Sequence, residues 1–287
     1  MRRRWKYWVY PLLTSAAILL LLDSCLQFRM SKKEVDEYFA DKQVNGTLSS
    51  YEIGPQVIRY LETGPTDGPT VLFVHGSPGS LSSFIDFMSD TSLNKRAHLI
   101  TVDRPGFGYS NFGNAEPSIQ KQAALLKPLV EKNNTHRPIV LVGHSLGGPV
   151  VARMAMDFPD LIDGVILVSP SIDPSLEPKE WYRTLFATPL LSWILPRSIR
   201  ASNDEIYNLK PELEEMLPLW SLVKARVIVI QGGKDSLVDP GNADFAAKMM
   251  KNTKVILVKV EDMNHFVPWT NPKLIREAVL DQLDSIN

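Results

Sequence analysis

A serine between two glycines is the residue of this chain best placed to do chemistry. Ser145 is the centre of a Gly-x-Ser-x-Gly sequence over residues 143–147, after the apolar run 139–142 and before a helical pattern over 146–158. In this strand–turn–helix setting a tight turn raises the serine hydroxyl clear of the sheet. Side chains two residues before or after the serine would collide with the neighbouring strand and helix, and the helix start favours developing negative charge. The sequence therefore predicts Ser145 as a nucleophile that needs a base to take its proton.

One histidine follows the last predicted strand and is the candidate for that base. His265 comes after the apolar run 255–260, whereas the other histidines lie in turn motifs or at the starts of strands. We expect two of these to shape turns and two to be solvated at the surface: His75 and His144 for the turns, His98 and His136 for the surface. His265 is thus predicted to act as the general base and then as the acid that protonates the leaving group.

The carboxylate that would orient this histidine has more than one candidate. Asp235 follows two glycines and a lysine after the apolar run 227–230. Asp239 lies on the same loop and Asp173 follows the preceding strand, so both stay open as alternatives. Asp103, in the turn after another strand, is expected to form that turn rather than to take part in catalysis. A carboxylate at Asp235 would fix the histidine tautomer and stabilise the imidazolium.

Apolar runs that alternate with helical patterns indicate the fold class. The later runs are almost continuously apolar, as in parallel strands covered by helices on both faces. Strands are predicted at residues 51–53, 56–61, 70–74, 99–102, 139–142, 165–168, 227–230 and 255–260, and helices at 119–131, 146–158, 243–251 and 273–286. Strand–helix alternation with short links predicts an α/β fold with a mostly parallel central sheet.

One segment, residues 170–225, interrupts this alternation and is too long for a structureless loop. It contains Trp181, Trp193 and Trp220, and a Ser-x-x-Glu sequence at 202–205 has the form of a helix capping box. We interpret the segment as a helical cap that is inserted into the sheet domain and roofs a pocket with aromatic side chains. The alternative is a passive insertion whose tryptophans belong to the core.

These motifs together resemble those of the α/β-hydrolases, from about residue 50 to the C-terminus. His-Gly-Ser-Pro-Gly at 75–79 is similar to the family's oxyanion segment, and the sequence 103–110 is similar to its turn after the next strand. The order Ser, Asp, His along the chain is the one that this fold uses. The resemblance implies an α/β-hydrolase fold in which Ser145, Asp235 and His265 form a catalytic triad.

The resemblance also implies an oxyanion hole, formed by the backbone N–H groups of Ser77 and Leu146. The expected reaction is the cleavage of a carboxylic ester through an acyl-enzyme, with a small-molecule apolar ester as substrate. The same triad could act on C–C, amide or thioester bonds, and a non-catalytic binding protein on this fold is a further alternative. A serine nucleophile argues against the haloalkane dehalogenases and epoxide hydrolases of this fold, which use aspartate.

The N-terminus has the features of an export or anchoring segment. Basic residues near the start precede an apolar stretch over 9–22, which is short for a transmembrane helix because such a helix needs about 20 residues. The sequence Leu-Asp-Ser-Cys at 22–25 resembles a bacterial lipoprotein signal, from which only Asp23 departs. The resemblance implies cleavage before Cys25, lipidation of that cysteine and a membrane-anchored place in a bacterial cell envelope. An uncleaved signal anchor and simple secretion are the alternatives.

Composition excludes several other classes of protein. The chain has 287 residues and a formal net charge of −1, so it has no global basic field to attract nucleic acid. A single cysteine excludes an internal disulfide and a multi-cysteine metal site, and no metal or organic cofactor is expected. The predicted organisation is a signal peptide over 1–24, a tether over 25–48, a first part of the hydrolase core over 49–169, the cap over 170–225 and a second part of the core over 226–287. The expected partners are a small-molecule substrate and a membrane, and the sequence predicts no oligomeric state.

Overall fold

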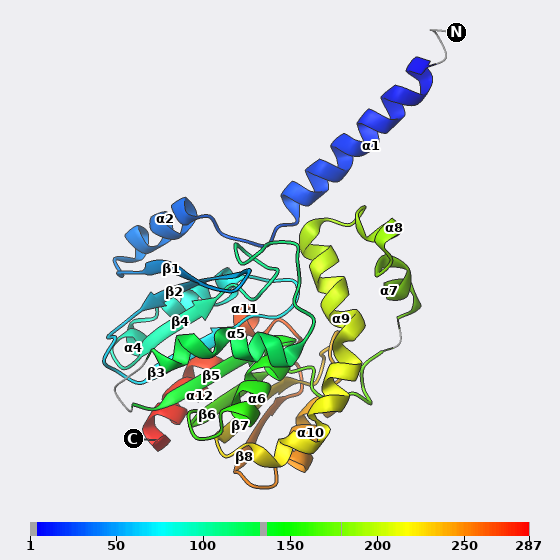
Figure 1. Ribbon diagram of the computed structural model, residues 1–287. Helices are drawn as coiled ribbons and strands as arrows, with labels where there is room; N and C mark the ends of the chain where they lie inside the picture. The colour runs from blue at the N-terminus through cyan, green and yellow to red at the C-terminus, as the bar shows by residue number, and fades with distance from the viewer. Residues whose placement is uncertain (1–4, 133–136, 179, 287) are drawn as a thin grey trace.

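The computed structural model describes residues 5–132, 137–178 and 180–286 (Figure 1). Within these residues, eight strands form one sheet in the order β1-β2-β4-β3-β5-β6-β7-β8. The strands are β1 Thr47–Ile53, β2 Gln56–Thr63, β3 Thr70–Val74, β4 His98–Val102, β5 Ile139–His144, β6 Gly164–Val168, β7 Arg226–Gly232 and β8 Val255–Val260. Neighbouring strands from β4 to β8 are parallel, whereas β2 pairs antiparallel with both β1 and β4. The predicted α/β class with a mostly parallel sheet is confirmed.

The central strands form because their side chains are buried on both faces of the sheet. Every residue of β3, β4, β5 and β6 is buried. Such strands read as continuous apolar runs, and the predicted strand over 70–74 coincides with β3 at both ends. The predicted strand over 255–260 likewise coincides with β8, which is a half-buried edge strand. β1 lies at the edge of the sheet, and the turn at Gly54 and Pro55 joins it to β2.

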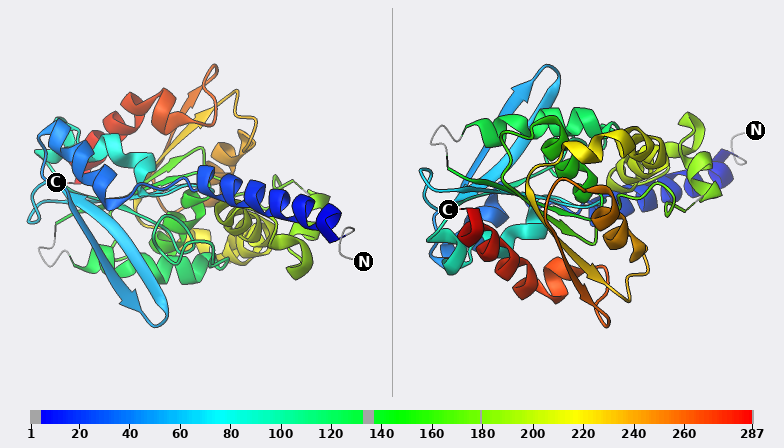
Figure 2. Two further views of the ribbon diagram at one scale, coloured as in Figure 1. Left: turned by 90° about the horizontal axis from the view of Figure 1, so that it is seen from above. Right: turned by 90° about the horizontal axis from the view of Figure 1, so that it is seen from below.

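Helices cover both faces of this sheet. They are α2 Lys32–Lys42, α3 Ile85–Met88, α4 Thr91–Asn94, α5 Ile119–Glu131, α6 Gly147–Asp157, α10 Gly241–Met249, α11 Val267–Thr270, α12 Pro272–Ile286 and the 3₁₀ helix η1 Leu81–Phe84. Figure 2 shows α5 and α6 on one face, and α12 with α4 on the other. Buried apolar side chains of α5, α6 and α10 form one core cluster with the sheet, and those of α2, α11 and α12 form the second. The sheet thus lies between two apolar layers.

The segment between β6 and β7 forms helices of its own. These are α7 Trp181–Phe186, α8 Pro189–Ser192, α9 Arg197–Met216 and the 3₁₀ helix η2 Leu217–Leu222. The helix start expected at 202–205 was wrong, because Ser202 and Glu205 are buried inside α9. The tryptophans also differ from one another: Trp220 belongs to the core, whereas Trp181 and Trp193 are exposed.

The N-terminal region contains two helices. α1 spans Trp5–Cys25 and projects from the body beside the start of α9 (Figure 1). Residues 32–42, which lie in the expected tether, form α2, whose Val35 and Phe39 are buried in the core. α2 begins with a reciprocal cap, since Ser31 Oγ accepts from the Glu34 backbone N–H and a Glu34 carboxylate oxygen accepts from the Ser31 N–H. Among the helices of the described residues, none combines the length and the apolarity needed to cross a membrane.

Candidate active site

Ser145 occupies a strained turn between β5 and α6. Its φ is +53°, a left-handed conformation that residues other than glycine seldom adopt. A Cβ at Gly143 would lie 2.4 Å from the Gly147 carbonyl oxygen, and a Cβ at Gly147 would lie 2.3 Å from the Val74 carbonyl oxygen. Both distances are too short for a side chain, so the prediction that these two positions require glycine is confirmed. Their absent side chains let the turn lie tight against β3 and expose the serine.

His265 and Asp235 form a buried pair on the loops after β8 and β7. His265 Nδ1 lies 2.8 Å from Asp235 Oδ2, so Nδ1–H donates to the carboxylate, and this contact selects the tautomer of the neutral ring in which Nε2 is the acceptor. The other carboxylate oxygen accepts from the backbone N–H groups of Leu237 and Val238 at 3.0 and 2.8 Å. Burial alone would raise the pKa of Asp235. The hydrogen bonds from His265 and from these backbone groups have a larger, opposite effect, so the pKa lies below its ordinary value of 3.8. This carboxylate is therefore ionised and holds the imidazole in one tautomer.

The other acidic candidates have local roles. Asp239 Oδ1 accepts from the Gly241 N–H at 2.8 Å, and Asp173 Oδ1 accepts from the Ser175 N–H at 2.8 Å. Each of these carboxylates therefore stabilises the turn in which it lies, and in the described residues neither is bonded to His265. Of the three candidates, Asp235 is the one that the structure pairs with this histidine.

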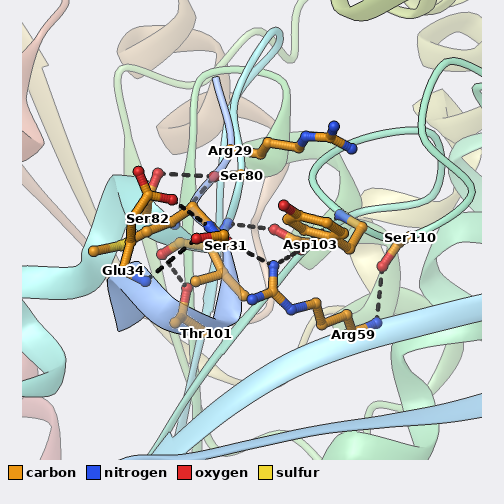
Figure 3. A network of polar contacts seen from close by, with 12 residues as sticks. Arg29, Ser31, Glu34, Arg59, Ser80, Ser82, Thr101, Asp103 and Ser110 are labelled. Atoms are coloured by element: carbon orange, nitrogen blue, oxygen red, sulfur yellow. Dashed lines mark hydrogen bonds and ion pairs between the residues drawn. The ribbon is translucent and has the colours of Figure 1, made fainter. Parts of the chain in front are cut away.

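Asp103 has the turn-forming role that the sequence predicts. It is fully buried and accepts hydrogen bonds from the backbone N–H groups of Leu81 and Tyr109, at 2.8 and 2.9 Å. Arg59 Nη1 lies 3.3 Å from the same carboxylate. Figure 3 shows Arg59 and Asp103 in one network of polar contacts. Asp103 thus connects the segments that contain Arg59, Leu81 and Tyr109, and its contacts are structural.

Ser145 and His265 open into one cavity beneath the cap. The cavity has a volume of about 500 Å³, and Ser77 and Leu146 line it as well. Cap residues and the loop after β7 complete its wall, among them Glu177, Arg183, Ser202, Ile206, Leu209 and Val238. The aromatic roof expected from the tryptophans was wrong, because none of the lining residues of this cavity is a tryptophan. The wall instead combines aliphatic side chains with charged and hydroxyl groups.

Two backbone N–H groups are available near the serine. Neither the Ser77 N–H nor the Leu146 N–H donates a hydrogen bond to another group of the described residues. A Cβ at Gly76 would lie 2.9 Å from Ser145 Cβ, so the absence of a side chain there lets the segment that carries Ser77 approach the serine. The buried Ser77 hydroxyl also lacks a partner among these residues. These donors could stabilise negative charge that develops on a substrate oxygen beside Ser145.

Comparisons with known proteins agree with this architecture. A family model described as the alpha/beta hydrolase fold matches residues 69–194. The solved structure of a putative lipase from Acinetobacter baumannii superposes with a TM-score of 0.67 at 19% identity, covering 88% of this chain and 96% of that chain. The chain has the α/β-hydrolase fold.

The sequence relatives of this chain match different shares of its length. The chain is 30% identical to the magnesium-chelatase 30 kDa subunit of Rhodobacter capsulatus over 127 residues, which are 42% of this chain and 41% of that protein. It is 24% identical to monoacylglycerol lipase ABHD6 of Homo sapiens over 78% of this chain and 77% of the lipase. The first of these matches thus spans about two fifths of the relative's own length.

His144 holds the loop that carries His265, a role that the sequence did not reveal. His144 is buried, and its Nε2 lies 3.0 Å from the His265 carbonyl oxygen, to which it donates. Burial, together with the nearby His265, lowers the pKa of His144 to about 3, so the ring is neutral. The expected turn-shaping role of His144 therefore extends to the neighbouring loop. No local pattern marks this contact, since 121 positions separate the two residues.

Arg104 is a second residue whose importance appears only in three dimensions. Its Nε donates to the His75 carbonyl oxygen at 2.8 Å, and its Nη2 donates to the Gly76 carbonyl oxygen at 3.0 Å. The Arg104 backbone N–H donates to His75 Nε2 at 3.0 Å, so His75 shapes this turn as expected. Glu205 of α9 binds the guanidinium from the cap side, at 2.6 and 3.0 Å. Arg104 thus connects the cap to the backbone just before Ser77.

Three further predicted residues can be placed. His98, expected at the surface, is buried: β2 pairs with β4 in the sheet and brings Glu62 beside it, with a carboxylate oxygen 3.2 Å from His98 Nε2. His136 lies outside the described residues. Cys25, the predicted lipidation site, is an exposed free cysteine at the end of α1. In the described part of the chain, no cluster of three or more His, Cys, Asp or Glu side chains could hold a metal ion.

Proposed function

We propose that this protein is a serine hydrolase that cleaves carboxylic esters through an acyl-enzyme. The hydrogen bond between His265 Nδ1 and Asp235, at 2.8 Å, carries the proposal, together with the cavity that Ser145 and His265 share. The family-model match and the similarity to a monoacylglycerol lipase support a hydrolase. The left-handed turn at Ser145 supports a serine nucleophile.

The proposed reaction assigns one step to each of these groups. His265 Nε2 takes the proton of the Ser145 hydroxyl while the serine oxygen attacks the ester carbonyl carbon. The N–H groups of Ser77 and Leu146 stabilise the oxyanion, and His265 then protonates the departing alcohol. Water, deprotonated by His265, attacks the acyl-enzyme and releases the carboxylic acid with Ser145 restored. The ionised Asp235 stabilises the imidazolium in both halves of the reaction.

The cavity wall suggests an ester with both apolar and polar parts. Leu146, Ile206 and Leu209 offer aliphatic surface to an acyl or alcohol chain, whereas Glu177 and Arg183 offer polar groups. Burial raises the pKa of Glu177, while its carboxylate accepts from the Ser171 hydroxyl, which lowers the pKa in turn. Cleavage of C–C, amide or thioester bonds by the same groups, and a purely binding role, stay alternatives that a substrate panel separates.

A fluorophosphonate probe tests the nucleophile directly. The folded protein should be labelled rapidly at Ser145, the Ser145→Ala variant should not be labelled, and Ser285→Ala, a serine exposed on α12, should be labelled like the wild type. A panel of nitrophenyl esters, amides and thioesters of matched chain length then ranks the bond types. Absence of label on folded wild-type protein, or its persistence in Ser145→Ala, would refute the serine mechanism.

We also propose that the N-terminal segment holds the protein at a membrane of the bacterial cell envelope. Its basic start, the apolar stretch over 9–22 and the lipoprotein-like sequence before Cys25 support this location. Intact-mass analysis of the protein purified from membranes separates the two routes of attachment. A mature chain that begins with a lipidated Cys25 indicates processing, whereas an unmodified full-length chain indicates an uncleaved anchor.

A further inference from the structure

Large apolar side chains of the cap are exposed on α7, on α8 and just after α8. Trp181, Leu185, Leu190 and Trp193 are exposed by 76, 45, 77 and 62%. We call these four side chains the α7–α8 face. Over residues 181–195 the sequence has one charged residue, an arginine, and no acidic one. A group of exposed apolar side chains with so little charge marks a surface that meets another apolar phase.

The N-terminal segment is fastened to the cap beside this face. The Asp23 carboxylate accepts from the Arg197 backbone N–H at 2.7 Å, and from its Nη2 and Nε at 2.7 and 3.0 Å. Arg197 is the first residue of α9, and Pro196 before it provides no side-chain cap. Asp23 therefore takes the place of a capping side chain and lies at the positive end of the helix dipole. The hydrogen bonds to Arg197 lower the pKa of Asp23, which keeps this carboxylate ionised.

The residues after Asp23 continue this attachment along the body. The Ser198 hydroxyl donates to the Leu26 carbonyl oxygen, and Arg59 Nη1 donates to the Met30 carbonyl oxygen at 2.9 Å. The Arg29 guanidinium lies 4.5 Å from the ring centre of Tyr109, and Figure 3 shows Arg29 near the Asp103 network. α1 thus leaves the body from a fixed point. Figures 1 and 2 agree that α7, α8 and α1 lie at the same end of the molecule.

We propose that the α7–α8 face docks on a lipid bilayer, and that the Asp23–Arg197 pair holds α1 beside it so that both contact the same bilayer. Tryptophan is the residue that prefers the membrane–water interface, and this face has two of them. Residues 181–195 contain no acidic group that anionic lipid would repel, and Glu180 just before them is paired with Arg183. The face also lies at the same end of the molecule as the apolar N-terminal helix. Docking at the interface requires no helix that crosses the bilayer.

A second cavity lies next to the candidate active site and reaches this face. It has a volume of about 510 Å³ and is lined by Trp181 of the face. It shares Glu177, Arg183 and Ile206 with the cavity that contains Ser145. A molecule that occupies this cavity therefore contacts side chains that also line the cavity of Ser145. Docking itself does not rest on ester hydrolysis, so the two proposals can fail separately.

The proposal has a consequence for processing at Cys25. Asp23 precedes Cys25, so cleavage before the cysteine would remove the carboxylate that caps α9. It would also leave Arg197 without this ion pair. A docked cap held by Asp23 thus requires a chain that keeps its first 24 residues. Of the two routes of attachment above, the docking proposal therefore predicts the uncleaved anchor.

A fluorophore sensitive to its environment tests the docking at the cap itself. In full-length protein with Cys25→Ser, a single cysteine for labelling is introduced as Leu190→Cys on α8, or as Leu222→Cys on η2 for the matched control. Leu222 is an exposed leucine at the far end of the cap. Vesicles of phosphatidylcholine and phosphatidylglycerol are then added. We expect a blue shift and a rise in emission at position 190 and none at position 222.

Further variants separate lipid from the other occupants of the face. Adding Asp23→Ala should reduce the emission change at position 190, although α1 is still present. In unlabelled protein, Leu190→Ser combined with Trp193→Ser should lower vesicle binding by about a hundredfold or more, because each substitution removes the burial of a large apolar side chain. Unchanged emission at position 190 with vesicles would overturn the proposal. So would a change that depends on protein concentration without vesicles, because the face would then bind a second copy of the chain.

Discussion

Replacement of Glu205 by leucine should destabilise the protein and slow its reaction, because this carboxylate neutralises a buried arginine. The Arg104 side chain is 0% exposed and that of Glu205 is 1% exposed. The guanidinium uses all five of its N–H groups: one on His75, one on Gly76, one on Gln122 and two on Glu205. Glu205→Leu leaves two of these donors and the positive charge unpaired away from water.

The size of the effect follows from this burial. Removal of one partner of a buried ion pair costs about 3–5 kcal/mol, since the remaining charge is desolvated without compensation. For a protein of this size that corresponds to a fall in Tm of roughly 6–20 °C. Because Arg104 also holds the carbonyl groups just before Ser77, a misplaced oxyanion donor should lower kcat by about 10- to 100-fold.

Thermal unfolding and steady-state ester hydrolysis measure the two effects. Glu214→Leu makes the same chemical change at an exposed position of α9 and should shift stability by no more than about 0.5 kcal/mol. Arg104→Met combined with Glu205→Leu removes both charges and should cost less than the sum of the single variants. A loss below about 1 kcal/mol in Glu205→Leu, with kcat unchanged, would refute the reasoning.

Three smaller perturbations address the site more directly. Asp235→Asn should lower kcat by about 10⁴-fold, because the amide favours the wrong histidine tautomer. In the folded protein the pKa of Asp235 lies below 3.8, so the ionised carboxylate stabilises the fold above pH 3.8 and this stabilisation is lost as the pH falls further. The difference in unfolding free energy between wild type and Asp235→Asn should therefore become smaller in acid. Gly147→Ala should give little folded protein on expression at any temperature, because its Cβ would lie 2.3 Å from the Val74 carbonyl oxygen. His144→Phe keeps a ring but loses the donor to the His265 carbonyl, so kcat should fall more than KM changes in a nitrophenyl ester assay.

The central sheet could be predicted because its signal is local. Strands buried on both faces must be apolar at every position, so runs such as 70–74 are recognisable without their neighbours. The turn at Ser145 is also recognisable locally, because the close contacts of Gly143 arise within the strand–turn–helix unit, although those of Gly147 come from β3 and the residue after it. Asp235 could be named as a candidate but not chosen, because its loop and the preceding one each offered a rival carboxylate.

The errors concern residues whose partners are distant in sequence. The true start of α9 at Arg197 has no capping side chain nearby, because Asp23, 174 positions away, supplies the cap. The Ser-x-x-Glu pattern at 202–205 was therefore a stronger signal of a helix start than anything near Arg197. Its residues lie inside α9, where Glu205 is buried because it binds Arg104. His98 was assigned to the surface because its polar surroundings conceal the antiparallel pairing of β2 with β4. Local patterns do not contain this information.

Helix α9 takes part in two ion pairs, of which only the exposed one should respond to salt. The Asp23–Arg197 pair at its start is partly exposed, with side chains 20 and 45% accessible, whereas the Arg104–Glu205 pair is inaccessible to solvent. Salt screens exposed charges, with a screening length of about 3 Å at 1 M, but acts little on buried ones. Raising the ionic strength should therefore reduce the emission change at position 190 on vesicles while leaving kcat on a soluble ester unchanged. A fall in kcat that parallels the loss of docking would contradict this prediction. It would mean that loss of the Asp23–Arg197 ion pair at one end of α9 also disturbs the Arg104–Glu205 pair and the residues before Ser77.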